Sequence, residues 1–384
     1  MSSTPRLLLG VLLLFPLAML AQGKKRTDQP LEMTRLPAVP TMPDAFPQVV
    51  GTQVFGPSYK FTKDDAVLEA AKGISAMGSR ILKINAVSGQ QLTPYIAMPF
   101  THYVVWYRSS GEWTKGFTPE LRRREYNATY HFAKDLLTRY DATGKTFFLG
   151  HWEGDWYLLP DKDVKKDVSP ELAAAMVEWL NVRQKAVDDA RSEVPYSKCR
   201  VYTYAEVNRV RDAMKDGRKR MVNAVLPKAN VDFVSYSAYD CQLLPAEEVR
   251  ATLDYVNAQL PAKAGLPAKR VFIGECGLSW KACGADGAKH EQRNREILAK
   301  FLTWKPVMIL FWQYYNNEVV DGEQVGFWLV DNKNQKTPLH GTLTELFAAQ
   351  EEASREMRGR ARRLPGYEEI AAFSESWLNA RAPR

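Results

Sequence analysis

The segment RVFIGECGLSW, residues 270–280, contains the apolar run Val271-Phe272-Ile273, then a glycine, and then Glu275. A continuous apolar run of this length is typical of a parallel strand covered on both faces, because a strand with one solvated face alternates apolar and polar residues. The segment therefore predicts a buried strand of an α/β domain. A carboxylate at the end of such a strand is costly to bury without a partner, so Glu275 is the first candidate functional residue.

Seven further runs of the same kind occur along the chain, separated by segments with helical periodicity. The eight expected strands lie within residues 48–55, 80–87, 101–108, 145–156, 199–207, 231–240, 270–280 and 307–315. A helix is expected after seven of the eight strands, and these helices cover residues 64–77, 118–140, 169–192, 207–226, 245–259, 289–304 and 342–350. The segment after residues 80–87 is expected to be a loop. Strands that alternate with helices pair in parallel, so eight such units predict an α/β fold, a single-domain (β/α)8 or TIM barrel.

The helix starts in the sequence agree with this scheme. SPEL at residues 169–172 and TPEL at residues 118–121 each place a hydroxyl residue before Pro and Glu, which marks an N-cap followed by a proline. An open dinucleotide-binding sheet is disfavoured, because VFGPSYKF at residues 54–61 has a single glycine where that fold has a G-x-G-x-x-G motif.

Residues 1–21 are predicted to be a secretory signal peptide. An apolar run at residues 7–21 ends in small residues and is followed by basic residues 24–26. The run is shorter than the roughly 20 residues that span a bilayer, so the sequence predicts a secreted or periplasmic protein. An uncleaved signal anchor is the alternative, since Met19 is an imperfect residue two positions before a cleavage after Ala21.

The remaining chain divides into three parts. Residues 22–48 are rich in proline and polar residues and are expected to form an extended lead-in. Residues 49–350 hold the strand and helix units of the barrel. Residues 351–384 contain the charged segment REMRGRARR and are expected to form a charged helical extension that packs loosely on the barrel.

The formal charge of +8 at pH 7 arises from 52 Lys and Arg residues against 44 Asp and Glu residues. These residues are spread along the chain and mostly interleaved, which is typical of a solvated surface rather than of a nucleic-acid interface. No nucleic acid is expected as a partner, and no membrane beyond the export signal.

The chain has four cysteines, Cys199, Cys241, Cys276 and Cys283, and five histidines. An even number of cysteines in an exported protein is compatible with disulfide bonds. Their spacing does not fit a zinc site and the histidines are scattered, so neither a metal nor an organic cofactor is expected.

The carboxyl ends of the strands carry the active site of a (β/α)8 barrel. Glu153, after the fourth strand, and Glu275, in the seventh, lie across the barrel from each other in this strand order. Paired carboxylates suit glycoside cleavage, in which one acid protonates the leaving oxygen and the other attacks or activates water, while sugar rings stack on Trp and Tyr. The other candidates at the strand ends are Trp106, Tyr107, Arg108, His151, Trp152, Asp155, Trp156, Tyr202, Tyr204, Glu206, Tyr236, Tyr239, Asp240, Trp312, Gln313 and Tyr314.

The segments FIGECG, DFVSYSAYD and ILFWQYY resemble strands 7, 6 and 8 of the clan A glycoside hydrolases. The resemblance spans roughly residues 49–345 and implies a cofactor-free, retaining glycoside hydrolase with a (β/α)8 fold, acting on an oligosaccharide or polysaccharide. It implies that Glu275 is the nucleophile and Glu153 the acid/base. It also implies that Tyr239 hydrogen-bonds the nucleophile and that Trp312 forms the floor of the subsite for the reacting sugar. The other expected substrate-binding residues are Trp152, Asp155, Tyr204 and Tyr236.

Two positions depart from the clan pattern. Trp152 stands directly before the acid/base glutamate, where the clan has Asn, and Ser237 stands two residues before Tyr239, where His is common. Glu206, in YTYAEVN, is the competing candidate for the acid/base. Asp155 either raises the pKa of Glu153 by like-charge repulsion or pairs with an arginine.

The cysteines and histidines near the strand ends leave alternatives open. A bridge between Cys241 and Cys283 would join two loops on the same face of the barrel. Cys276 is expected to point away from the substrate if Glu275 points toward it, and it is not expected to be a catalytic thiol. His151 and His102 are either contacts for sugar hydroxyls or packed side chains.

Two other functions compete with glycoside hydrolysis. A non-catalytic carbohydrate-binding (β/α)8 barrel would keep the aromatic residues without the chemistry. A metal-dependent barrel hydrolase acting on esters or phosphates is disfavoured, because the strand ends lack the grouped His and Asp ligands that such sites require.

Overall fold

The computed structural model of the protein describes residue 42, residues 46–107 and residues 112–381. All of these belong to one compact unit. The expected signal peptide, residues 1–21, lies outside the described residues, as do most of the expected lead-in and Arg108. None of the helices within the described ranges combines the length and the apolar character that crossing a membrane requires.

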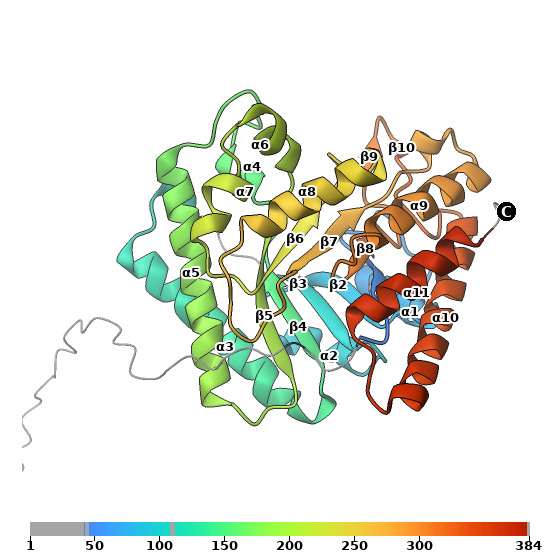
Figure 1. Ribbon diagram of the computed structural model, residues 1–384, viewed down its shortest axis with the longest axis horizontal. Coiled ribbons are helices and arrows are strands. Elements are labelled where there is room, and N and C mark those ends of the chain that lie inside the picture. The colour runs from blue at the N-terminus through green and yellow to red at the C-terminus, as the bar shows by residue number, and fades with distance from the viewer. Residues whose placement is uncertain (1–41, 43–45, 108–111, 382–384) are drawn as a thin grey trace, which may run out of the picture. The chain divides into compact units, whose positions relative to one another are not determined.

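Eight parallel strands close into a barrel in the order in which they occur along the chain (Figure 1). Their bounds are β1 Val50–Gln53, β2 Ile81–Ala86, β3 His102–Tyr107, β4 Thr146–Gly150, β5 Arg200–Val207, β6 Phe233–Ser237, β7 Val271–Cys276 and β8 Ile309–Phe311. Each strand lies within one of the eight segments expected from the sequence, and β8 pairs with β1 to complete the ring. The predicted α/β fold, a single-domain (β/α)8 barrel, is confirmed.

Aromatic side chains fill the barrel interior around Phe148 of β4. The Phe148 ring lies 5.3 Å from that of Tyr202, 5.2 Å from that of Phe233 and 6.0 Å from that of Phe272, and all four side chains are buried. The buried His102 of β3 lies 6.4 Å from Phe148. Inward residues of five consecutive strands therefore form a packed core, which fixes the positions of the strand ends.

Helices surround the barrel, and two of them begin as the sequence predicts. Thr118 and Ser169 accept hydrogen bonds from the backbone N–H groups of Leu121 and Leu172. The helix bounds are α1 Ala66–Ala76, α2 Gly89–Ile96, α3 Pro119–Arg139, α4 Asp155–Leu158, α5 Pro170–Glu193, α6 Val210–Asp216, α7 Met221–Ala224, α8 Ala246–Ala258, α9 Gly287–Leu302, α10 Pro338–Ala361 and α11 Tyr367–Asn379. A short hairpin of β9 Val319–Val320 and β10 Glu323–Gln324 follows β8.

Two connections differ from the sequence prediction. The segment after β2, expected to be a loop, forms helix α2. This helix contains Pro94, and proline inside a short segment argues against a helix in the sequence alone. The continuous helix expected over residues 207–226 is divided into α6 and α7, because Gly217 adopts a left-handed conformation with φ of 67° and ends α6.

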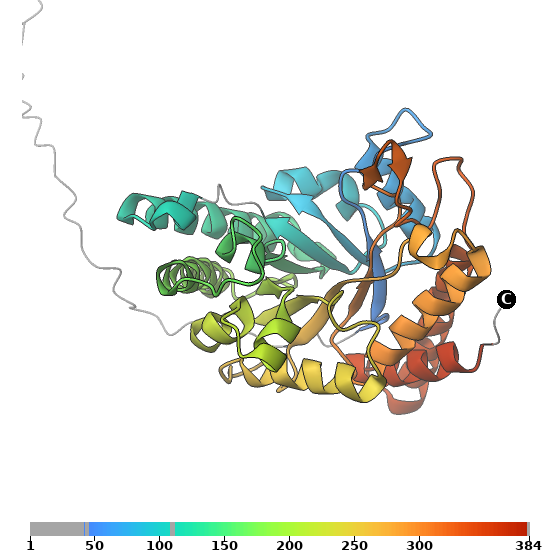
Figure 2. The same ribbon diagram turned by 90° about the horizontal axis from the view of Figure 1, so that it is seen from above.

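The C-terminal residues are part of the packed structure and not a loosely attached extension. Helix α10 continues past Gln350 to Ala361, so the expected boundary between residues 350 and 351 falls inside a helix. Helices α9, α10 and α11 lie side by side on one flank of the barrel (Figures 1 and 2). Ile370 and Leu378 of α11 are fully buried, and Arg295 of α9 donates to the Leu378 carbonyl at 3.0 Å. The sequence prediction was wrong here because the many charges of this segment hide the apolar face of α11.

All four cysteines are buried and unpaired. The bridge between Cys241 and Cys283, which the sequence left open, is therefore not formed. Cys241 lies in the turn after β6, where its N–H bonds the Ala238 carbonyl, and Cys283 lies in a separate turn closed by the Ser279 and Trp280 carbonyls. Each thiol is enclosed by its own turn, and burial raises the pKa of both.

The buried face of α11 predicts a loss of stability for the variant Ile370→Ala. Deletion of this side chain leaves a cavity between the last helix and its neighbours, so we expect a decrease of about 2–5 kcal/mol in the free energy of unfolding, measured by urea denaturation. Ser376→Ala, at an exposed position of the same helix, is the control, with an expected change below about 0.5 kcal/mol. Equal effects of the two variants would show that α11 contributes nothing to the core.

Candidate active site

Strand β7 brings Glu275 into the barrel through a local irregularity. Ser237 of β6 pairs with Glu275 after a shift of register that leaves Gly274 as an extra residue in β7. A bulge of this kind bends the strand and redirects the side chains beside it. The Glu275 carboxylate consequently contacts Lys83 of β2 as well as Ser237, the last residue of β6.

Glycine is required before Glu275 because there is no room for a side chain. A Cβ atom at Gly274 would lie 1.8 Å from the Ser235 hydroxyl and 2.7 Å from Glu206 Oε2. These distances are far below van der Waals contact, so any other residue would displace both groups. The Ile-Gly-Glu end of the strand thus combines a close approach of three strands with the presentation of a carboxylate.

The two glutamates singled out in the sequence are brought together by one hydroxyl. Ser237 Oγ lies 2.5 Å from Glu153 Oε1 and 3.5 Å from Glu275 Oε2. The two carboxylate oxygens are therefore within about 6 Å of each other, which is close to the separation of about 5–5.5 Å found in retaining glycosidases.

Glu153 is held in a largely enclosed position. Its side chain accepts a hydrogen bond of 2.5 Å from Trp156 Nε1 in addition to that from Ser237, and the residue is 9% exposed. Burial raises the pKa of Glu153 to about 7, and the nearby Glu206 carboxylate acts in the same direction. Glu153 thus carries a proton below neutral pH, as a general acid must.

Glu275 is 3% exposed, and its charge is balanced by a lysine. Burial raises the pKa of Glu275, and the negative charges of Glu206 and Glu153 raise it further. The ammonium of Lys83, 3.4 Å from Glu275 Oε1, opposes this rise and favours the carboxylate form. The ionisation of Glu275 therefore depends on Lys83.

Lys83 is the member of the candidate site that the sequence interpretation missed. Its side chain is fully buried in β2, and its Nζ lies 3.0 Å from Glu206 Oε2 and 3.0 Å from the Gly274 carbonyl. The sequence contains a signal for it, because Lys83 is the charged residue in ILKINA, a strand expected to be buried. A lysine in such a strand requires a buried acidic partner.

Aromatic side chains adjoin the carboxylates on the side of β3 and β8. Phe55 stacks on Trp312 at 5.7 Å and lies 3.7 Å from Trp106, whose ring is 4.7 Å from Lys83 Nζ. Trp152 meets the edge of Trp106 at 6.3 Å and is 39% exposed. Trp312 and Trp152 therefore belong to one aromatic group, together with Phe55 and Trp106, beside the paired glutamates.

Tyr239 also lies near both glutamates. Their charges, together with burial of its hydroxyl, raise the pKa of Tyr239, and the residue keeps 36% of its surface exposed. The hydroxyl that contacts both carboxylates belongs to Ser237 rather than to Tyr239. Ser237, at the position where His is common in clan A, thus performs the bridging contact in this chain.

Three expected substrate-binding residues are buried. Tyr236 donates its hydroxyl hydrogen to Asp240, and Tyr204 lies over Gly150 and against Phe272. Asp155 accepts three backbone N–H groups, at 3.1 Å from Asn208, 3.1 Å from Arg209 and 2.8 Å from Met221. Burial raises the pKa of Asp155, and these N–H groups oppose the rise. The burial of these three side chains could not be foreseen, because side-chain direction and backbone partners are not visible in the strand-end pattern, and their roles in substrate binding stay predictions.

The two histidines near the barrel interior are packed. His151 bonds the Trp152 carbonyl through Nδ1 at 3.0 Å, and its Nε2 accepts from the Glu206 N–H at 3.4 Å. Burial lowers the pKa of His151 to about 3. His102 stacks on Phe46 at 4.7 Å, and burial lowers its pKa to about 4. Both side chains are neutral and structural.

The competing acid/base candidate, Glu206, is fully buried and its oxygens are occupied. Oε1 accepts the Glu153 N–H at 3.1 Å, and Oε2 accepts the Ser235 hydroxyl at 2.6 Å beside Lys83. Within the described ranges, no group of three His, Cys, Asp or Glu side chains is arranged to hold a metal ion. The place among the three glutamates is filled by the ammonium of Lys83.

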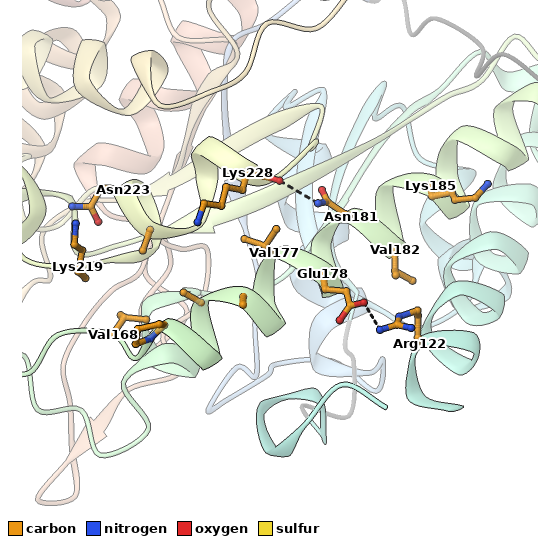
Figure 3. A pocket seen from close by; sticks show the side chains of 14 residues that line it. Arg122, Val168, Val177, Glu178, Asn181, Val182, Lys185, Lys219, Asn223 and Lys228 are labelled. Carbon is orange, nitrogen blue, oxygen red and sulfur yellow. Dashed lines mark hydrogen bonds and ion pairs between the residues drawn. The ribbon is translucent and has the colours of Figure 1, made fainter. Parts of the chain in front are cut away.

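A groove on the outer surface lies apart from the paired glutamates (Figure 3). It has a volume of about 850 Å³ and is lined mainly by α5 and by residues near α7. Arg122 pairs with Glu178 on one side, and Asn181 donates to the Lys228 carbonyl at 3.1 Å on another. Its lining contains no aromatic side chain, in contrast to the aromatic residues beside the paired glutamates.

No family model and no curated protein match this sequence. Among the similar solved structures are three glycoside hydrolases. The chain has the barrel fold of these enzymes. An exo-β-1,4-mannosidase from Opitutaceae bacterium strain TAV5 is 12% identical, with a TM-score of 0.54 over 82% of this chain and 63% of that protein.

The other two are β-glucuronidases. The enzyme from Bifidobacterium dentium is 11% identical, with a TM-score of 0.51 over 78% of this chain and 46% of that protein. The enzyme from Ruminococcus gnavus is 9% identical, with a TM-score of 0.50 over 78% of this chain and 51% of that protein. The chain therefore covers less than two thirds of the length of each, and the similarity establishes the fold alone.

The crowding at Gly274 predicts that Gly274→Ala will destabilise the protein. The added methyl group must displace the Ser235 hydroxyl and Glu206, so we expect a loss of about 1–3 kcal/mol in the free energy of unfolding by guanidinium denaturation. Gly359→Ala is the matched control. No atom lies near its Cβ position in α10, so this change is expected to stabilise by up to about 1 kcal/mol. A neutral or stabilising Gly274→Ala would contradict the close approach at β7.

Proposed function

We propose that the protein is a retaining glycoside hydrolase that cleaves a glycosidic bond in an oligosaccharide or polysaccharide. The observation that carries the proposal is the shared contact of Glu153 and Glu275 with Ser237. This contact limits the distance between Glu153 Oε1 and Glu275 Oε2 to about 6 Å. Inverting enzymes hold their carboxyl groups about 6.5–9.5 Å apart to admit a water molecule. The barrel fold, common to the mannosidase and glucuronidases, supports the same class of reaction.

The proposed mechanism gives each glutamate one role at a time. Glu153 donates its proton to the leaving oxygen while Glu275 attacks the anomeric carbon, which forms a covalent glycosyl-enzyme. Water then attacks this intermediate, with Glu153 accepting the proton of the water. The raised pKa of Glu153 supports its part as the acid, and Trp156 and Ser237 orient its two oxygens.

The aromatic group supplies the surface for the sugar. Trp312 is proposed as the floor of the subsite for the reacting ring, and the exposed Trp152 as a second stacking surface. Tyr239 is proposed to hydrogen-bond either the substrate or the nucleophile once a ring occupies the site. A carbohydrate substrate is favoured over a nucleic acid, because the groups gathered here are carboxylates and aromatic rings rather than cations.

The proposed place of action is outside the cytoplasm, in the periplasm or the medium. Support comes from the apolar run followed by basic residues in the first part of the sequence, which is characteristic of a secretory signal peptide.

Removal of either glutamate tests the assignment. We expect Glu275→Ala and Glu153→Ala to lower hydrolysis of a panel of aryl glycosides and polysaccharides by at least about 100-fold. Azide is expected to rescue Glu275→Ala with a glycosyl azide of inverted configuration, and Glu153→Ala with one of retained configuration. Glu368→Ala, an exposed glutamate of α11, is the control and is expected to hydrolyse at the wild-type rate.

Absence of turnover by the wild-type protein across this panel, together with binding of an oligosaccharide, would favour the non-catalytic carbohydrate-binding barrel. Trp152 would then be the residue to replace, since it stands where clan A enzymes have an Asn that contacts the sugar.

The raised pKa of Glu153 predicts an alkaline decline in activity. Because the acid form is needed and the pKa is raised to about 7, kcat/KM should fall as pH rises above that value. The 2,4-dinitrophenolate of an aryl glycoside departs without protonation. The rate of enzyme glycosylation by a 2,4-dinitrophenyl glycoside should therefore fall little over the same pH range. Equal alkaline declines for this substrate and for an unactivated alkyl glycoside would rule out Glu153 as the general acid.

A further inference from the structure

We propose that the buried ammonium of Lys83, held in place by Glu206, is a positioning group that keeps Glu275 ionised and leaves its Oε2 as the attacking oxygen. This inference rests on the proposed glycoside hydrolase function and extends it to two residues outside the acid and nucleophile pair.

The surroundings of Lys83 match the donors of an ammonium group. Its Nζ has three acceptors, Glu206 Oε2 at 3.0 Å, the Gly274 carbonyl at 3.0 Å and Glu275 Oε1 at 3.4 Å. A lysine has three N–H donors, so each has one acceptor. The ring of Trp106, 4.7 Å away, covers this group. A fully buried ammonium with an acceptor for each donor is held in a fixed position, so Lys83 places a positive charge in the site rather than only packing its hydrocarbon chain.

Glu206 links this charge to the acid. Its Oε2 receives Lys83 and the Ser235 hydroxyl, while its Oε1 receives the backbone N–H of Glu153. One buried carboxylate therefore fixes both the cation that faces the nucleophile and the backbone that carries the acid. Movement of Glu206 would change the distance between Glu153 and Glu275, although it touches neither of their carboxylates.

The charges in this cluster cannot all be present at once. Three glutamates share one ammonium. Burial raises the pKa of Tyr204, Tyr239 and Cys276, which are neutral near pH 7, and lowers the pKa of His151 to about 3, so it is neutral too. The charged groups Arg183 and Glu318 act on Tyr204 and Tyr239 rather than on Glu275. One proton must therefore stay in the cluster. Glu206 and Glu275 contact Lys83 directly, whereas the Glu153 carboxylate is bonded by Ser237 and Trp156. The proton is held best by Glu153, which gives one acid and one ionised nucleophile.

The two oxygens of Glu275 have different neighbours. Oε1 faces Lys83, and Oε2 faces Ser237, with Glu153 Oε1 on the far side of that hydroxyl. Oε2 is thus the oxygen beside the acid and free of the cation. In the first step Oε2 bonds to the anomeric carbon, the bond to the leaving oxygen breaks, and the Glu153 proton passes to that oxygen.

The second step restores the negative charge of Glu275 beside Lys83. The oxygen of water bonds to the anomeric carbon, a water proton passes to Glu153, and the bond from Oε2 to carbon breaks with its electron pair. The restored carboxylate places its negative charge beside the ammonium at Oε1. Lys83 therefore stabilises Glu275 as the leaving group of this step as well as the nucleophile of the first.

The variant Lys83→Met tests the proposal, because it keeps the length of the side chain and removes its charge. We expect the apparent pKa of Glu275 to rise by about 1–3 units, since that is the effect of losing an opposite charge at this distance. The pKa is measured by 13C NMR of protein labelled at the glutamate carboxyl carbons, with Glu275 assigned from its absence in Glu275→Gln. The acidic limb of the kcat/KM profile should move to higher pH by the same amount.

Three further variants separate this role from a structural one. Lys145→Met is the matched control, because Lys145 is half-buried and its ammonium contacts two backbone carbonyls, those of Met98 and Phe100. It should leave both the NMR titration and the acidic limb unchanged. The double variant Lys83→Met with Glu206→Gln removes the pair without leaving a lone buried charge, so it serves even if Lys83→Met alone fails to fold. Glu206→Gln alone is its reference, because it removes the same carboxylate and keeps Lys83 beside Glu275. Relative to that reference, the double variant should show the pKa of Glu275 and the acidic limb shifted to higher pH.

The outcomes are distinct. A folded Lys83→Met in which Glu275 titrates as in the wild type would overturn the proposal, as would a double variant in which Glu275 titrates as in Glu206→Gln. A loss of rate in Lys83→Met with an unshifted acidic limb would also overturn it. Failure of the glycoside hydrolase function itself would appear as absence of turnover in the wild-type protein. The NMR titration needs no substrate, so it would still decide whether Lys83 sets the ionisation of Glu275.

Discussion

The close approach of β5, β6 and β7 at Gly274 is the constraint on which the rest of the site depends. Because Gly274 has no side chain, Ser235 and Glu206 can lie directly against the β7 backbone. Lys83 then reaches the Gly274 carbonyl and Glu275 from the other side of the barrel. The buried carboxylate of Glu275 is tolerated because Lys83 of β2 supplies its counter-ion beside the bulge.

The barrel could be predicted from the sequence because its signals are local. Each strand is a short apolar run, and each well-marked helix begins at a hydroxyl residue that accepts an N–H from its own first turn. Helix α2 was missed because Pro94 contradicts the local signal, and packing against the barrel outweighs it. The division between α6 and α7 was missed because one glycine in a left-handed conformation ends the first helix.

Residues of the candidate site could be predicted only where their place at the end of a strand was sufficient to identify them. Glu153 and Glu275 follow from the rule that strand ends meet at one edge of the barrel. The burial of Tyr204, Tyr236 and Asp155 depends on which way each side chain turns and on backbone partners that are distant in sequence. Lys83 went unnoticed for a related reason. The partners that place Lys83 in the site are Glu206 and Glu275, which are 123 and 192 residues further along the chain.

The pairing of β1 with β8 has a consequence for how the protein folds. Contacts that close the ring, such as that from the Phe55 N–H to Gln313, join residues 258 positions apart, and α11 still has to pack after them. Loop closure over such a distance is slow, so the ring forms only after most of the chain is available. A chain synthesised from its N-terminus would therefore remain open for most of its synthesis. Such a delay is compatible with the proposed export, in which the chain would cross the membrane before it folds.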